Sequence, residues 1–102
     1  MTEYRARAKV SADHPCLPGH FPGNPIVPGV LLLELVADAI KCWRGPQAEV
    51  ARFNNVKFVS LLRPEETLEI VLHGEGPNLR FRCECAGRLL SQGSLELVAV
   101  SA

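Results

Sequence analysis

Hydrophobic and polar positions alternate in several short stretches of the chain, a pattern typical of strands with one buried face. Residues 4–10 show it most strictly, because apolar or small side chains take every second position and cations the positions between them. The same pattern predicts further strands over residues 48–59, 67–73, 79–85 and 89–100. We expect a bulge or bend at Asn54 and Asn55 and another bulge at Gly93.

Residues 30–43 break this alternation, because most of their positions are apolar. A helix that is apolar nearly all round is expected to be buried rather than laid on a surface. The polar exceptions, Glu34, Asp38 and Lys41, recur at a spacing that places them on one stripe of the helix. A Gly-Pro pair at residues 45–46 ends the helix.

The length fits one domain that spans residues 1–102, and one long helix among several strands gives the α+β class. Apolar residues make up 47% of the 102 positions, which is enough for one core. The formal net charge is zero, so the composition gives no support to nucleic-acid binding. Neither a secretory signal nor an apolar run of membrane-spanning length is recognised, and we expect a cytoplasmic protein.

The four cysteines lack the density and spacing of a disulfide framework. Cys83 and Cys85 are two residues apart on a predicted strand, so both should lie on its apolar face as free thiols in a reducing cytoplasm. His14, Cys16 and His20 lie close together in the sequence. Because no second group with metal-ligand spacing accompanies them, we predict no metal site.

The richest candidate chemistry lies in residues 17–34, where a loop of prolines and glycines leads into the helix, with Pro28 expected at its first position. The loop carries His20, and an imidazole can take and return a proton near neutral pH. The helix carries Glu34, and a carboxylic acid in an apolar setting tends to keep its proton. Gly29 lies at the helix start, where free backbone N–H groups favour negative charge. Together these groups indicate proton abstraction next to a carbonyl.

The spacing His20-Phe-Pro-Gly-x-Pro-x-x-Pro-Gly-Val30, with Glu34 in the following helix, resembles the signature of the 3-hydroxyacyl-[acyl-carrier-protein] dehydratases. Residues 53–58 and the following 62–66 resemble the second signature of this family. The resemblance implies the hot-dog fold, a curved antiparallel sheet wrapped around one long helix. It also implies a dimer, either with a second copy or with a related hot-dog chain, with the active sites at the dimer interface.

The resemblance further implies the reaction and its residues. The substrate would be a (3R)-3-hydroxyacyl thioester on an acyl carrier protein. His20 of one protomer would remove a C2 proton, the Gly29 amide would bind the thioester carbonyl, and Glu34 of the other protomer would hold or protonate the leaving hydroxyl. Neither a cofactor nor a metal is implied, because the thioester already acidifies the C2 proton. The acyl chain would lie near the apolar residues Phe21, Val30, Leu33 and Phe58.

One departure from the family pattern is Asp38, where these dehydratases commonly carry glutamine. A second carboxylate one turn away could help to keep Glu34 protonated, or it could reflect a changed substrate contact. The compact length and Asp38 together favour a specialised polyene or polyketide pathway slightly over fatty acid synthesis.

Three alternatives remain open. Hydration is the same reaction in reverse, and thioester hydrolysis is another chemistry of this fold. A non-catalytic partner subunit is the third, although such a chain would usually have lost the histidine or the acid. The cationic side chains of residues 4–10, Arg5, Arg7 and Lys9, are typical of a solvated strand face and could also dock an acidic carrier protein.

Overall fold

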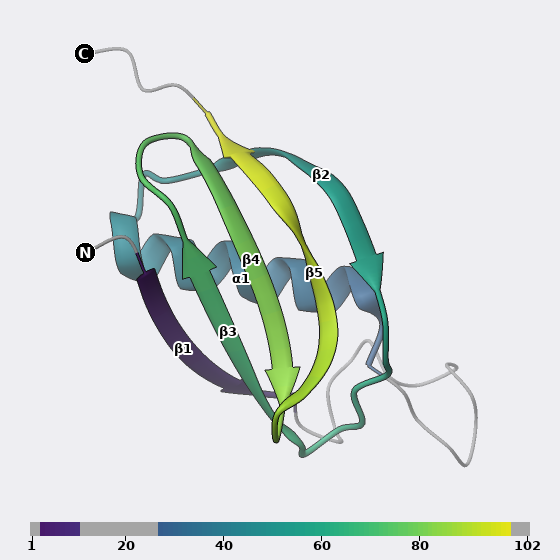
Figure 1. The fold of residues 1–102 in the computed structure, drawn as a ribbon. Helices are drawn as coiled ribbons and strands as arrows, with labels where there is room; N and C mark the ends of the chain where they lie inside the picture. Colours follow the sequence, from purple (N-terminus) through teal and green to yellow (C-terminus); the bar gives the residue numbers. More distant parts are fainter. Residues whose placement is uncertain (1–2, 11–26, 99–102) are drawn as a thin grey trace.

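A computed structural model describes residues 3–10 and 27–98 of the chain, in which five antiparallel strands curve around one helix (Figure 1). The elements in chain order are β1 (Glu3–Lys9), α1 (Gly29–Arg44), β2 (Val50–Phe58), β3 (Thr67–His73), β4 (Asn78–Cys85) and β5 (Arg88–Leu97). The strand order in the sheet is β1-β3-β4-β5-β2, which leaves β1 and β2 at the edges. The predicted helix, the predicted strands and the α+β class are confirmed, although β2 is shorter than residues 48–59 and β5 ends at Leu97.

The helix begins at Gly29, one residue before the predicted apolar run of residues 30–43 and one residue after Pro28, which was expected at its first position. Pro28 has an extended backbone (φ −60°, ψ 143°) and is the cap residue, while its carbonyl accepts the N–H of Leu31 at 3.0 Å. The predicted end is confirmed, because Gly45 adopts a φ of 109° and donates its N–H to the Lys41 carbonyl at 2.9 Å. In the described part of the chain, no helix is long and apolar enough to cross a membrane.

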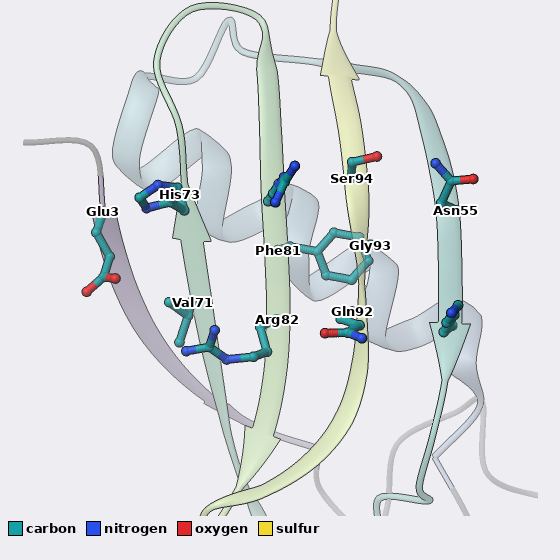
Figure 2. A pocket seen from close by; sticks show the side chains of 11 residues that line it. Glu3, Asn55, Val71, His73, Phe81, Arg82, Gln92, Gly93 and Ser94 are labelled. Carbon is teal, nitrogen blue, oxygen red and sulfur yellow. The ribbon is translucent and has the colours of Figure 1, made fainter.

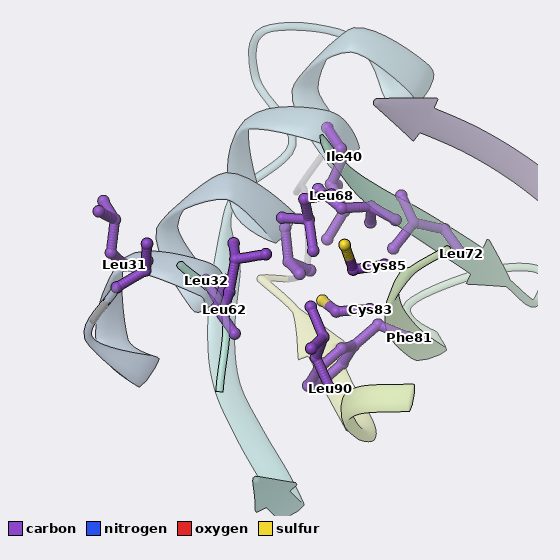
Figure 3. Close-up of a cluster of buried hydrophobic side chains, with 14 of the residues drawn as sticks. Leu31, Leu32, Ile40, Leu62, Leu68, Leu72, Phe81, Cys83, Cys85 and Leu90 are labelled. Atoms are coloured by element: carbon purple, nitrogen blue, oxygen red, sulfur yellow. The ribbon is translucent and has the colours of Figure 1, made fainter. Parts of the chain in front are cut away.

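The core lies between the concave face of the sheet and one side of α1 (Figure 3). Val36 and Ile40 of the helix are fully buried, and each such side chain contributes about 1.5–3 kcal/mol of hydrophobic stabilisation. The sequence predicted burial nearly all round the helix, and this was wrong for the described chain. Glu34 and Asp38 are exposed, and Val30 is 65% exposed. The reason is that a single sheet covers only one side of the helix.

The C-terminal end of α1 is tied to the sheet by aromatic and cationic contacts. Trp43 stacks on Tyr4 of β1 with ring centroids 5.7 Å apart. The guanidinium of Arg44 lies over the Trp43 ring and donates hydrogen bonds to the carbonyls of Gly74 and Gly76 at 3.0 and 2.9 Å. These contacts join the helix to both β1 and the β3–β4 turn, so they fix its direction across the sheet.

The predicted irregularity at Asn54 and Asn55 is confirmed, since the β2–β5 register shifts between Asn54 and Lys57 and Asn55 has a φ of 53°. The bulge predicted at Gly93 is confirmed in position but not in strand, because Gly93 lies opposite the two extra residues of β2, between the pairs Gln92–Lys57 and Ser94–Asn54. On its other side Gly93 pairs in regular register with Phe81 of β4, and the β4–β5 register shifts further along the strands, between Cys83 and Glu84. A Cβ on Gly93 would lie 3.0 Å from the Phe81 ring, so the glycine is needed for close packing.

The predicted burial of Cys83 and Cys85 is confirmed, with exposed fractions of 0% and 7%, and both thiols are free. Burial raises the pKa of the Cys83 thiol to about 12, so this thiol stays protonated and unreactive at neutral pH. Cys42, on the helix, is free and exposed. Cys16 lies outside the described residues.

Candidate functional site

The N-terminal end of α1 and the C-terminal end of β2 meet at Gly29 and Phe58. A Cβ built on Gly29 would lie 2.7 Å from Cε1 of the Phe58 ring, so the ring rests directly against the glycine backbone. As the first helical residue, Gly29 carries an amide that has no carbonyl partner within the helix. This end of the helix therefore combines backbone N–H groups and the positive end of the helix dipole with an aromatic wall.

Val30 and Glu34 follow on one side of the helix, because residues four apart lie one above the other. Both are exposed, and Asp38 continues the same stripe one turn later. Leu33 is half-buried and packs against the core. The apolar surroundings that the sequence suggested for Glu34 are therefore not formed by the described residues of a single chain, and they would have to come from elsewhere.

Exposed apolar side chains gather around this end of the helix. Phe58 is 55% exposed, Val59 56% and Leu61 60%, in addition to Val30. The neighbouring Leu62 is buried, and its carbonyl accepts the N–H of Val27 just before the helix. We call Val30, Phe58, Val59 and Leu61 the apolar rim. A rim of this kind beside a helix start provides a place for an acyl chain or for a partner chain.

The structure brings several of the predicted site residues together and leaves others undescribed. Gly29, Val30 and Phe58 meet at the helix start, and Leu33 and Glu34 lie on the first turns of the same helix. His20 and Phe21 lie outside the described residues, so their roles and the pairing of His20 with Glu34 stay predictions.

Sequence reasoning missed two members of the apolar rim, Val59 and Leu61. The available signal was their apolar character just beyond a predicted strand, shortly before the Arg63-Pro64 turn. This signal does not by itself indicate an exposed site, because apolar residues at a strand end are ordinarily core residues.

We expect Gly29→Ala to reduce activity more than stability. The added methyl group would meet the Phe58 ring at 2.7 Å, but that ring is half-exposed and can move, so the free energy of unfolding should fall by only about 1 kcal/mol. The displaced ring and the new methyl group would obstruct a carbonyl at the helix start. Turnover measurements and thermal denaturation would test this.

The matched control for Gly29→Ala is the double variant Gly29→Ala/Phe58→Leu. The smaller side chain relieves the clash with the ring and should restore stability, while the new methyl group still blocks the amide. Recovery of full activity in the double variant would contradict a role for the Gly29 backbone in binding substrate.

Solved structures with this arrangement include one of the ApeI:P dehydratase heterocomplex from Xenorhabdus doucetiae. It superposes with a TM-score of 0.83 at 25% identity and covers 96% of this chain and 88% of that one. An acyl-CoA hydrolase variant from Staphylococcus aureus superposes with a TM-score of 0.68 at 15% identity, over 97% of this chain and 66% of the other. The second likeness concerns the fold alone. The architecture is that of the hot-dog class.

Sequence comparison gives the family. The profile of the ApeI-like family, described as ApeI dehydratase, matches residues 1–94, and the chain belongs to this family. Among curated relatives, the 3-hydroxyacyl-[acyl-carrier-protein] dehydratase FabZ of Latilactobacillus sakei is 38% identical over 72 residues, which cover 64% of this chain and 51% of the relative. FabZ of Haemophilus influenzae is 53% identical over 36 residues, which cover 35% and 24% of the two chains. The chain thus spans about half the length of the first curated relatives it matches.

Proposed function

We propose that this chain acts in the dehydration of (3R)-3-hydroxyacyl-acyl-carrier-protein thioesters to trans-2-enoyl thioesters, in a polyene or polyketide type of pathway in the cytoplasm. The observation that carries the proposal is the exposed helix start, where Gly29, Val30 and Glu34 share one end of α1 beside Phe58. Membership of the ApeI-like dehydratase family supports it.

In the proposed reaction, His20 removes a proton from C2 of the acyl group, and electron density moves toward the thioester carbonyl. The amide of Gly29 donates a hydrogen bond to that carbonyl oxygen, where negative charge develops. Glu34 delivers a proton to the C3 hydroxyl, the C3–O bond breaks, and water leaves as the C2–C3 double bond forms. The proton taken up by His20 later returns through solvent to Glu34.

We further propose that the working unit contains a second hot-dog chain. The exposed stripe of α1 and the apolar rim would be covered by this chain, which would give Glu34 the apolar surroundings that one chain does not provide. The similar ApeI:P structure is a heterocomplex, so a related chain is a candidate beside a second copy. A non-catalytic role within such a pair is the second candidate function.

The experiment is dehydration of a 3-hydroxyacyl-carrier-protein by the purified protein, alone and together with a related hot-dog chain from the same organism. Intact-mass spectrometry of the carrier protein follows the loss of one water molecule. We expect water loss with at least one of the two preparations, and loss only in the mixture would identify a heterodimer.

Other outcomes would contradict the proposal. Release of the free carrier thiol would indicate thioester hydrolysis instead. Absence of any reaction over several acyl chain lengths, from a well-folded dimer of either kind, would exclude the dehydratase. Water loss that persists unchanged when His20 and Glu34 of this chain are both replaced would assign the catalytic groups to the partner.

A further inference from the structure

The sheet face that points away from α1 contains an open hollow of about 620 Å³ (Figure 2). It extends across the sheet from Glu3 of the edge strand β1 to Asn55 and Lys57 of the other edge strand, β2, with the helix behind the sheet in this view. Its polar lining includes Lys57, His73, Arg80, Arg82, Gln92 and Ser94. The hollow lies on the opposite side of the sheet from Glu34 and belongs to no part of the candidate active site.

The charges that line this hollow are unbalanced. Glu3 is the single carboxylate in its lining, and it already forms an ion pair with Arg5 at 3.2 Å. Arg82 is paired with Glu84 at 2.6 Å. Arg80 and Lys57 form no ion pair with any carboxylate in the described part of the chain. Two uncompensated cations therefore remain in a hollow that also offers the side-chain amides and hydroxyl of its lining as hydrogen-bonding groups.

The cations of β1 differ from these, although the sequence made them the more obvious candidates for docking. Arg5 binds Glu69 of the neighbouring strand at 2.8 Å as well as Glu3, and Arg7 lies 3.9 Å from the same Glu69 carboxylate. Exposed pairs of this kind contribute little stability, but they reduce the charge available to a partner. Lys9, the third cation of β1, forms no ion pair with a carboxylate of the described residues, but it does not line the hollow. Within the hollow, the free positive charge lies at Arg80 and Lys57.

The hollow also lies close to the candidate active site. Lys57 is the neighbour of Phe58 in β2, and neighbouring side chains of a strand point to opposite faces of the sheet. Lys57 lines the hollow, while Phe58 packs on Gly29 at the helix start. A carrier protein over the hollow would therefore stand beside the strand that forms one wall of the active site.

We propose that this basic hollow, centred on Arg80 and Lys57, is the docking surface for the acidic acyl carrier protein that brings the substrate. This inference rests on the proposed dehydratase function and adds to it the surface that recognises the carrier. Complementary charge on an open surface mainly raises the rate of encounter and orients the partner, so the hollow acts through KM and leaves the chemical step unchanged.

The test compares three substrates with the same 3-hydroxyacyl group, carried by the acyl carrier protein, by coenzyme A and by N-acetylcysteamine. The variant is Arg80→Glu/Lys57→Glu, and its matched control is Arg7→Glu, a charge reversal on the same sheet face outside the hollow. For the carrier-bound substrate we expect KM to rise about tenfold or more in the double variant, with kcat unchanged. For the N-acetylcysteamine thioester we expect the double variant to keep the KM and kcat of the wild-type protein.

Salt provides a second readout. The wild-type KM for the carrier-bound substrate should rise with ionic strength, and this dependence should weaken in the double variant because part of the attraction has been removed. Circular dichroism would confirm that the variants fold, which is expected because both side chains are exposed.

Each contrary outcome has a definite meaning. An equal rise of KM in Arg7→Glu would overturn the proposal that the carrier protein docks on the hollow. An unchanged KM in the double variant would overturn it as well. An equal loss with the coenzyme A thioester would mean that the hollow binds a phosphate rather than the carrier protein, which also overturns it. If the wild-type protein dehydrates none of the three substrates with either partner arrangement, the proposed function itself has failed, and this result is distinguishable from all the others.

Discussion

His20→Ala should lower the rate of water loss from a 3-hydroxyacyl-carrier-protein by about a thousandfold, within the 10²–10⁴ range typical of a lost general base. The C2 proton next to a thioester is only weakly acidic, so its removal at neutral pH depends on a positioned base. The measurement is intact-mass spectrometry of the carrier protein under single-turnover conditions, which separates the chemical step from product release.

The chain offers its own control for this prediction. His14 lies shortly before His20, but the family signature places the base at His20, so His14→Ala should retain nearly full activity. A comparable loss in both variants would indicate that the loop needs histidines for its conformation. Retention of activity in His20→Ala would show that His20 is not the general base. Glu34 would then be the remaining candidate for this role.

The secondary structure was predictable because the strands alternate between apolar and polar positions, whereas the helix is a longer apolar run between a proline and a glycine. Strand β3 was predicted with its observed bounds, Thr67–His73, since its polar ends coincide with turn residues. The helix end at Gly45 was equally clear, because a glycine followed by proline cannot continue a helix. These signals are local, so the sequence contains them without any knowledge of the tertiary structure.

Features that depend on neighbouring strands could not be predicted in the same way. A glycine in a strand is compatible with a bulge in that strand and with a close approach of neighbouring strands. Gly93 lies opposite a bulge of β2 and against the Phe81 ring of β4, which its own sequence context does not show. The pairing of Arg5 with Glu69 depends on the β1–β3 register, which juxtaposes residues far apart in the sequence. The sequence alone does not show this register, so Arg5 and Arg7 could not be recognised as partners of the Glu69 carboxylate.

The candidate site was partly predictable for a related reason. Gly29 and Phe58 were both singled out from the family resemblance, and the structure places them in contact. The exposure of Glu34 was not foreseen, because the apolar run around it suggested burial on all sides. An apolar helix can be buried by its own sheet or by another chain, and the sequence pattern does not distinguish the two.

This exposure sharpens the second large prediction, which concerns the chemical role of Glu34. If Glu34 delivers the proton to the leaving hydroxyl, Glu34→Gln should lose activity nearly as completely as Glu34→Ala, by about 10²–10⁴-fold. The amide keeps the shape and one hydrogen-bond acceptor of the carboxylic acid but does not transfer a proton at neutral pH. Single-turnover water loss measured on the assembled dimer would test this.

Asp38→Asn is the matched control, because it changes the same kind of group one helical turn away on the same exposed stripe. We expect Asp38→Asn to lose much less activity than Glu34→Gln. If Glu34→Gln instead keeps most of the activity while Glu34→Ala loses it, Glu34 orients the leaving group, and His20 must serve as base and acid in turn. A proton-donating Glu34 also requires the surroundings that a second chain would supply, since the described residues of this chain leave it exposed. Glu34→Gln, Glu34→Ala and Asp38→Asn should therefore be compared in the assembled dimer, in which a second chain covers this stripe of the helix.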